Sequence, residues 1–254
     1  MKGRMEKMSW VQVKEAIKPS SVCLIPIGAT EQHGAHLNLD TDTFNVYEVC
    51  LRAAERLEDT LVTPAMPFGC SDNHINFPGT ISLRLETLKD VLKDMTRSLV
   101  HHGIKKIIFV VGHGGNITAS NAAAEELRAE MEGVLIGVSY IAALIEEGYK
   151  CLEGDIVWHS DEFETSFSLY LNPDEVDMSK AVDEIPVSPS DLFVFHEDAL
   201  SKSMVSYGLP MTDQCTKSGV FGYAKLASVE KGKVAGEETI DNLVKIVQQL
   251  QKVK

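Results

Sequence analysis

Lys105-Lys-Ile-Ile-Phe-Val-Val111 is the strongest strand candidate of this chain, and it opens directly into Gly112-His-Gly-Gly-Asn116. A continuous apolar run of this kind is typical of a parallel strand that is buried on both faces of its sheet. Helical spacing precedes the run over residues 84–102 and follows it over 118–132, and a further strand is predicted over 133–140. This alternation predicts an α/β fold in which helices flank a central, mostly parallel sheet.

Other stretches of the sequence predict further strands and helices of this fold. Val22-Cys-Leu-Ile-Pro-Ile27 is short and apolar and is stopped by Gly28, which predicts a second buried strand. Residues 61–66 predict a third strand, which Pro64 demotes to an edge or a bulge. Helices are predicted over residues 10–18, 43–57 and 237–252, and another is predicted to end near Leu171.

The chain is interpreted as a single domain over residues 1–254. No linker rich in Ser, Gly or Pro divides it, and no internal repeat is visible. Residues 183–218 are rich in Pro, Ser and Asp, with aromatic side chains at Phe193, Phe195 and Tyr207. We interpret this segment as a long excursion that covers a site or packs on a neighbour.

The composition argues against several classes of protein. A net charge of −13 repels nucleic acid and anionic membrane surfaces, so neither is expected as a partner. The five cysteines are widely spread and include no Cys-x-x-Cys pair, which is typical of a reduced protein without disulfides or a thiolate zinc site. The first ten residues lack the apolar core of a signal peptide, and no apolar run is long enough to span a membrane. We therefore expect a cytoplasmic protein.

The segment from Gly28 to Asp42 concentrates groups that bind metals. Within twelve residues it presents two imidazoles and three carboxylates, from Glu31, His33, His36, Asp40 and Asp42. These groups follow a predicted strand, which is where α/β sheets place their sites. Carboxylates and imidazoles without a thiolate suit a borderline or hard divalent ion such as Zn, Mn or Fe(II). The alternative is a polar surface loop rich in His and Asp.

The glycine-rich segment 112–116 places a histidine at the end of the strongest predicted strand. Glycines let the backbone turn sharply and approach a ligand closely. A phosphate loop is one interpretation, but the Gly-Lys-Ser/Thr of a Walker site and the dinucleotide spacing are both missing. The other interpretation is that His113 is a metal ligand and that Gly114 and Gly115 clear space for a substrate.

Two further segments carry candidate residues. In His159-Ser-Asp-Glu162 the two end residues would share one face of a helix, because positions three apart lie on the same side, whereas Glu164 would diverge from His159. The alternative is a solvated acidic helix start, which the helix dipole favours. The loop 68–83 is too long and irregular for a simple connector, and its reactive residues are His74 and Ser82. For His74, a capped loop histidine is the alternative.

Five blocks of the sequence, taken in order, resemble the creatininase (creatinine amidohydrolase) family. They are Glu31-Gln-His-Gly-Ala-His-Leu with Asp42, Asn76-Phe-Pro-Gly-Thr-Ile-Ser82, Gly112-His-Gly-Gly-Asn116, Phe163-Glu-Thr-Ser166, and Ser218-Gly-Val-Phe-Gly with Glu230-Lys-Gly232. Together the blocks span nearly the whole chain. The resemblance implies a creatininase-type layered α/β fold, assembly as a homohexamer and a site for two divalent metal ions per chain, zinc being expected and manganese or iron the alternatives.

The resemblance also implies roles for individual residues. Carried over by position, Glu31 and His113 resemble ligands of one metal ion. His33 resembles a ligand of the second ion, and Asp42 resembles the carboxylate that bridges the two. In the same way His159 falls where the family places its catalytic histidine.

The chain departs from the creatinine-hydrolysing members at several positions. Those members carry a Tyr-Glu pair where this chain has Gly114 and Gly115, and that glutamate binds the second metal ion. They also place tryptophans around the substrate, at positions that read here as Ile141 and Asp155. Creatinine is therefore not the expected substrate, and we predict that Glu162 supplies the missing ligand from the face shared with the catalytic histidine.

These observations predict a metal-dependent amidohydrolase that cleaves a C–N bond of a small amide or cyclic amide. Two divalent ions lower the pKa of bound water, and their charge stabilises a developing oxyanion. His159 would then shuttle a proton to the departing nitrogen, and Ser82 resembles a serine of the substrate pocket. The alternatives are a ring-opening hydrolase or a deformylase of a pathway intermediate, or a catalytically inactive oligomeric member.

Overall fold

The computed structural model describes residues 2–187 and 211–253, and a sheet of four parallel strands lies at its centre. The strands, in spatial order, are β2 (Thr60–Val62), β1 (Val22–Ile27), β3 (Lys106–Val111) and β4 (Leu135–Tyr140). The predicted parallel α/β sheet is confirmed. Strand β2 is shorter than the predicted 61–66, because a proline at position 64 cannot donate a hydrogen bond to a neighbouring strand.

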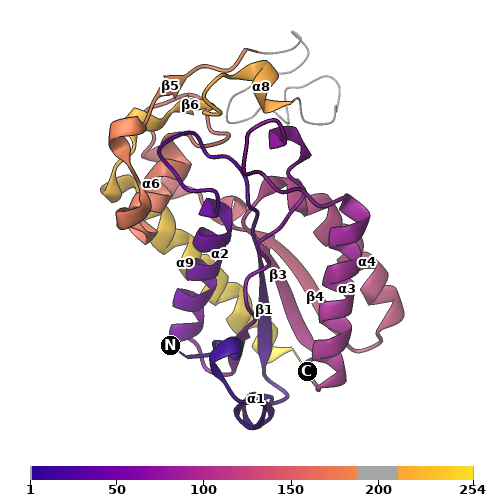
Figure 1. The fold of residues 1–254 in the computed structure, drawn as a ribbon. Coiled ribbons are helices and arrows are strands. Elements are labelled where there is room, and N and C mark those ends of the chain that lie inside the picture. Colours follow the sequence, from indigo (N-terminus) through magenta and orange to yellow (C-terminus); the bar gives the residue numbers. More distant parts are fainter. Residues whose placement is uncertain (1, 188–210, 254) are drawn as a thin grey trace.

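Helices cover both faces of this sheet, as Figure 1 shows. One face carries α2 (Thr41–Glu55), α6 (Glu162–Leu171) and α9 (Val229–Lys252), and the other carries α3 (Leu85–His101) and α4 (Ile117–Glu130). Strand residues alternate between the two cores: Leu24 and Val110 pack with α2, α6 and α9, whereas Ile25 and Phe109 pack with α3 and α4. Burial on both faces explains why β1 and β3 are continuously apolar.

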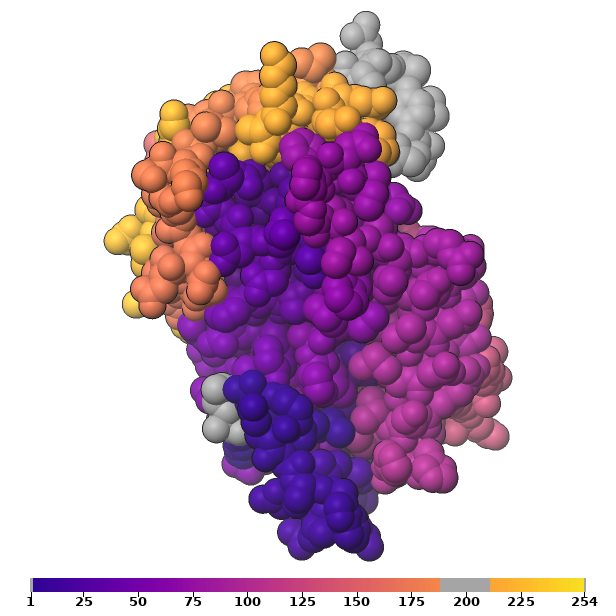
Figure 2. All heavy atoms as spheres, in the orientation of Figure 1, coloured from indigo at the N-terminus to yellow at the C-terminus, as the bar shows by residue number. Residues whose placement is uncertain are grey.

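The remaining elements are short. They are α1 (Trp10–Ala16), α5 (Glu147–Lys150), α8 (Thr212–Cys215), β5 (Asp183–Glu184) and β6 (Gly222–Tyr223), with 3₁₀ turns between them. In Figure 1 the β5–β6 ribbon and α8 lie beyond the carboxyl ends of the central strands. The space-filling view in Figure 2 shows the same orange and yellow segments packed on the indigo and purple ones at that end.

The structure describes part of the predicted excursion over residues 183–218. Phe193, Phe195 and Tyr207, the aromatic residues of the predicted excursion, lie outside the described residues. In the part of the chain that the structure describes, no helix has both the length and the apolar character needed to cross a bilayer.

Helix α9 begins at Val229, eight positions before the predicted start of the last helix. Ser228 caps it by accepting a hydrogen bond from the backbone N–H of Lys231. Glycines disfavour a helix in the sequence pattern, but here they serve close packing of α9 on α6. A Cβ on Gly232 would lie 1.8 Å from the main-chain oxygen of Ser166.

Candidate metal centre

The candidate site lies at the carboxyl ends of β1 and β3, which pair directly through Ile27 and Val111. The loop after β1 carries Glu31 and His33, the first turn of α2 carries Asp42, and His113 is the second residue after β3. All four side chains are at least nine-tenths buried. Four of the five predicted ligands therefore meet where parallel sheets place their sites.

The ligand atoms form two groups that share one carboxylate. In the first group Nδ1 of His113 lies 3.2 Å from Oε1 of Glu31 and 3.3 Å from Oδ2 of Asp42. In the second, Nε2 of His33 lies 3.4 Å from Oδ1 of Asp42 and 3.6 Å from Oε2 of Glu164. Within each group the three candidate atoms lie within 4.8 Å of one another, as the ligands of one ion must. Asp42 presents a different oxygen to each group.

Both imidazoles are oriented by a main-chain oxygen on the side away from the carboxylates. Nδ1 of His33 lies 3.1 Å from the main-chain oxygen of Glu31, and Nε2 of His113 lies 2.9 Å from that of Cys70. A carbonyl oxygen accepts a hydrogen bond from the protonated ring nitrogen beside it, so the other nitrogen of each ring is left to bind a cation. Metal-binding histidines are held in this way.

The side chain of Asn116 holds in place the loop whose main-chain oxygen, that of Cys70, contacts His113. The side-chain oxygen of Asn116 accepts a hydrogen bond from the backbone N–H of Cys70 at 2.8 Å, and its Nδ2 donates to the main-chain oxygen of Gly28 at 2.9 Å. The amide thus joins the loops that follow β1, β2 and β3.

The polar groups of this cluster lack partners that a cation would supply. Both carboxylate oxygens of Glu31, Nε2 of His33 and Oδ2 of Asp42 are buried without a hydrogen-bond partner among the described residues. Leaving buried polar atoms unpaired is costly, so each calls for an explanation. These are the atoms that face the two groups defined above, which fits occupation by cations.

The charge balance of the cluster supports the same interpretation. Burial disfavours the charged imidazole of His33, but Glu164 and Asp42 outweigh burial and hold its pKa well above the ordinary value. The pKa of His113 is raised in the same way, against burial, by Glu31 and Asp42. The carboxylates therefore draw positive charge into the site, and a divalent cation provides it at the same place.

Glu162 does not join the cluster, so the prediction that it faces the site was wrong. Its carboxylate pairs with Lys231 of α9 at 2.5 Å and accepts the backbone N–H groups of Glu153 and Gly154. The prediction assumed a helix running from His159 onward. Helix α6 begins only at Glu162, so the three-residue spacing does not place the two side chains on one face.

Glu164, which the helical spacing had turned away, occupies the position expected of Glu162. The signal was present in Asp161-Glu-Phe-Glu164, because an aspartate three residues before a glutamate is typical of a helix start. Asp161 does cap α6, and its carboxylate accepts the N–H of Glu164. With the helix starting at Glu162, the residue at position 164 points to the site.

We expect Glu162→Gln to lower the free energy of unfolding by about 2–3 kcal/mol, because it leaves the partly buried ammonium of Lys231 without its closest counter-charge. Lys231 keeps Glu153 as a second partner, which limits the loss. Urea denaturation would measure the change, with Glu15→Gln at an exposed position as the control. An unchanged midpoint in Glu162→Gln would contradict this account of the pair.

His159 lies with the cluster, and its side chain is buried. Its Nδ1 is 3.8 Å from both Glu31 and Glu164, and its Nε2 is 2.8 Å from the main-chain oxygen of Gln32. The side-chain nitrogen of Gln32 also lies 2.8 Å from this Nε2. When Nε2 carries the proton it donates to the main-chain oxygen, and the lone pair of Nδ1 then faces the carboxylates. Burial, together with the neighbouring histidines 74 and 33, lowers the pKa of His159 to about 3, so the ring is neutral at physiological pH.

His74, the histidine of the 68–83 loop, packs against His159. The rings of His74 and His159 have centroids 4.3 Å apart. Nδ1 of His74 lies 3.0 Å from the side-chain nitrogen of Gln32 and 2.9 Å from the hydroxyl of Thr212. Its Nε2 lies 3.4 Å from Oε1 of Glu31, so His74 contacts the site through that carboxylate.

The three predicted substrate positions differ in their surroundings. A Cβ on Gly114 would meet only the hydroxyl of Tyr140, at an ordinary 3.6 Å, so there is open space beside it. A Cβ on Gly115 would lie 2.3 Å from the main-chain oxygen of Cys70, so Gly115 is closely packed and clears no space for a substrate. The hydroxyl of Ser82 accepts the N–H of Ser71 and braces the 68–83 loop. Substrate contact at Gly114 and Ser82 stays a prediction.

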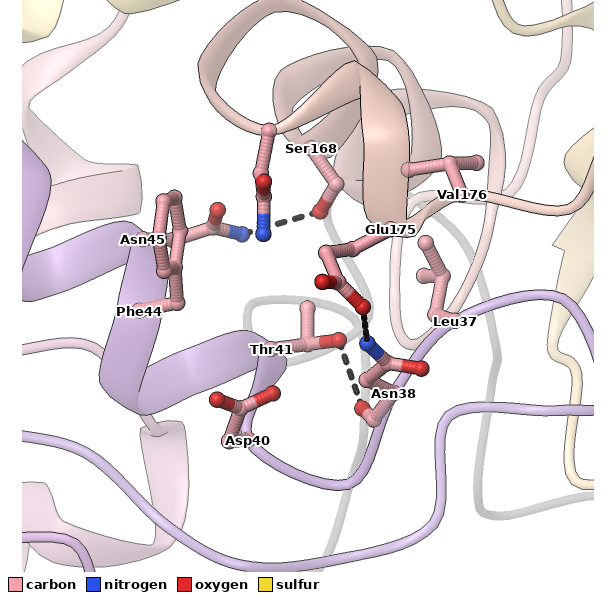
Figure 3. Close-up of a pocket in the computed structure, with 10 residues that line it drawn as sticks. Leu37, Asn38, Asp40, Thr41, Phe44, Asn45, Ser168, Glu175 and Val176 are labelled. Carbon is pink, nitrogen blue, oxygen red and sulfur yellow. Dashed lines mark hydrogen bonds between the residues drawn. The ribbon is translucent and has the colours of Figure 1, made fainter.

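The other polar residues of the loop after β1 serve structural contacts. Nε2 of His36 lies 2.9 Å from the hydroxyl of Thr165, and Asp40 is exposed before α2. Figure 3 shows a small pocket beside this helix start, with a volume of about 10 Å³. That volume suits about one water molecule, and the residues of the two ligand groups do not line it.

Comparison with known proteins agrees with this geometry. The family model described as creatinine amidohydrolase matches residues 6–247. The chain is similar to the creatinine amidohydrolase of Pseudomonas putida, with 30% identity over 96% of this chain and 95% of the relative. It is also similar to the 3-dehydro-scyllo-inosose hydrolase of Thermotoga maritima, with 28% identity over 96% of this chain and 82% of the relative.

Solved structures of creatininase share the fold over the whole chain. One is titled creatininase Mn and has a TM-score of 0.83 at 27% identity, covering 100% of both chains. Another, a variant creatininase titled Zn-Zn type, has a TM-score of 0.82 at 27% identity, again over 100% of both chains.

Proposed function

The chain belongs to the creatininase family of hydrolases, and from its site we propose that it hydrolyses a C–N bond of a small amide or cyclic amide with two divalent metal ions. Glu31, Asp42 and His113 would hold the first ion. His33 and Asp42 would hold the second. His159 would act as the catalytic histidine.

The observation that carries this proposal is the shared use of Asp42. Its two oxygens face two different imidazoles, at 3.4 Å and 3.3 Å, and the atoms turned inward have no other partner. A polar surface loop, the alternative for this segment, would leave these side chains in water rather than nine-tenths buried. Two adjacent cations bridged by a carboxylate are typical of hydrolytic sites.

When bound, the two ions would supply Lewis acidity and lower the pKa of a bound water molecule. The protein supplies the proton transfer. Neutral His159 accepts a proton at Nδ1 from the attacking water and then gives it to the departing nitrogen. The hydrogen bond from its Nε2 to Gln32 stabilises the ring while it is charged, and the nearby carboxylate of Glu164 favours the same state.

A second candidate reaction is hydrolysis of a cyclic ketone with ring opening. The similarity to a relative named 3-dehydro-scyllo-inosose hydrolase over 96% of this chain supports it. The two reactions differ in their products. C–N cleavage releases one amine or ammonia for each carboxylate formed, or leaves both on a single opened ring, whereas ketone cleavage produces a carboxylate and no new amine.

Metal analysis combined with a substrate screen tests the proposal. We expect the purified protein to contain two divalent ions per chain, and we expect hydrolysis of some lactam or small amide in a screen that scores carboxylate and amine separately. Loss of hydrolysis on chelation should be reversed by zinc or manganese. Protein that holds no divalent ion even after incubation with zinc and manganese would contradict the proposal.

Three further properties follow from the resemblance and from composition. We propose zinc as the resident metal, with manganese or iron as alternatives, a homohexamer as the assembly and the cytoplasm as the location. Creatininase structures titled with manganese and with zinc are consistent with the choice of metal. Light scattering of the purified protein would give the number of chains.

A further inference from the structure

We infer that Glu164 is the third protein ligand of the second metal ion, completing a site with His33 and Asp42. The inference rests on the proposed two-ion function and assigns the ligand that the proposal leaves open. It replaces the role predicted for Glu162.

The position of Glu164 matches that of a ligand. Its Oε2 lies 3.6 Å from Nε2 of His33 and 3.8 Å from Nδ1 of His159. With one oxygen of Asp42 and Nε2 of His33 it forms a group whose members lie within 4.8 Å of one another. Nε2 of His33 is fully buried and has no hydrogen-bond partner among the described residues. It is aimed at the space that Glu164 and Asp42 border.

The turn before α6 fixes the direction of the Glu164 side chain. Ser160 adopts φ 53°, in the left-handed region that disfavours residues other than glycine. This turn directs the backbone N–H of Ser160 to Oε2 of Glu164 at 2.6 Å. Asp161 then caps the helix through the N–H of Glu164 at 2.9 Å. Backbone strain of this kind persists where the surroundings enforce it, and it is frequent at functional sites.

Cross-links between α2 and α6 keep Glu164 and Asp42 in register. Figure 3 shows one end of this contact, where Nδ2 of Asn45 donates to the hydroxyl of Ser168 at 3.0 Å and Asn38 bonds to Glu175. Asn45 follows Asp42 by less than one helical turn. The side chains that hold the two helices together therefore lie next to the two carboxylates that would share an ion.

The neighbouring carboxylates among the described residues have other partners. Glu31 also lies in a candidate group with His33 and His159, but its Oε1 is 3.2 Å from Nδ1 of His113 in the first group. Glu162 is held by Lys231, and Asp161 accepts the N–H groups of Trp158 and Glu164 as a helix cap. Gly115 follows His113 at the strand end, but a Cβ there would collide with Cys70, so that backbone has no room for an acidic side chain. Glu164 is the carboxylate left to complete the group around His33.

Counting Glu164 gives the two sites matched ligands. Each site would have one imidazole and one carboxylate that binds only that ion, which is Glu31 in the first site and Glu164 in the second. Asp42 would bind both ions. Three protein ligands leave a coordination position open for water or substrate, as catalytic sites require. Three carboxylates also offset most of the charge of two divalent ions.

The test compares Glu164→Gln with Glu162→Gln, the same substitution two residues away. Wild-type protein and Glu162→Gln should each bind two manganese ions per chain and show the electron paramagnetic resonance spectrum of a coupled pair. Glu164→Gln should bind one ion tightly, show a mononuclear spectrum and hold the second ion at least about 100-fold more weakly. Circular dichroism would verify that each variant is folded.

The outcomes separate this inference from the proposed function. Two equally tight ions in Glu164→Gln, with two in the wild type, would overturn the ligand assignment and leave the two-ion hydrolase standing. A wild type that binds no manganese or zinc would overturn both. If Glu164→Gln does not fold, Glu164→Asp serves instead, since it keeps the charge but shortens the reach. A weakened second ion would then support the inference, and an unchanged one would overturn it.

Discussion

Replacing Asp42 with asparagine is expected to remove both metal ions and to lower kcat/KM by at least about 10³-fold, because several kcal/mol of metal-derived stabilisation is lost at 1.36 kcal/mol per tenfold. Asp42 is the one side chain that faces both imidazoles, through separate oxygens. An amide has nearly the same shape, but it carries no charge and offers one oxygen in place of two. Neither ion would then keep its shared ligand.

Metal content and activity are both needed to check this expectation. Asp40→Asn is the matched control, because it is two residues away, exposed and outside the ligand groups. It should keep two ions and full activity. If Asp42→Asn retained two ions with wild-type affinity, the shared carboxylate would not bridge them, and the arrangement proposed for the site would have to be abandoned.

Replacing His159 with glutamine should lower kcat by about 10²–10⁴-fold, the usual contribution of a general base, while both metal ions remain. The carboxamide nitrogen of glutamine can still donate to the main-chain oxygen of Gln32, but it cannot accept and return a proton. His159 also lies close to Glu31 and His33 in a third group of candidate ligands. The metal content of the variant therefore decides between a proton carrier and a ligand.

A loss of one ion together with activity would show that His159 is a ligand and not the proton carrier. The pH dependence gives an independent measure, since removing a general base flattens the acidic limb of the kcat profile. His101→Gln is a suitable control, because this exposed residue at the end of α3 belongs to none of the ligand groups. It should leave metal content and rate unchanged.

Much of the sheet could be predicted because its strands are apolar on both sides. Val22–Ile27 was expected with the bounds that the structure shows, and the strand ending at Val111 differs by one residue. The meeting of Glu31, His33, Asp42 and His113 was likewise expected, since parallel strands end at one edge. The long terminal helix was predicted too short, because a glycine such as Gly232 weakens a helical pattern while allowing another helix to approach.

The orientation of side chains around the site was harder to predict. Choosing between Glu162 and Glu164 required the residue at which α6 begins, because the spacing rule relates His159 to Glu162 only if both residues lie in the helix, and His159 lies before it. The close packing of Gly115 was also hidden, because it depends on the carbonyl of Cys70 from a loop more than forty residues earlier. Spacing within one segment carries no information about such contacts.

The near-contact of Gly232 with Ser166 has a consequence for engineering this enzyme. Ser166 lies two residues beyond Glu164 on α6. A change that pushes α9 away from α6 would therefore also move Glu164, the proposed ligand of the second ion. Libraries designed to change metal preference or reaction rate should therefore vary the contact between α9 and α6 as well as the residues around the metal site. Truncating the C-terminal segment would disturb the metal site in the same way, because α9 packs on the helix that carries Glu164.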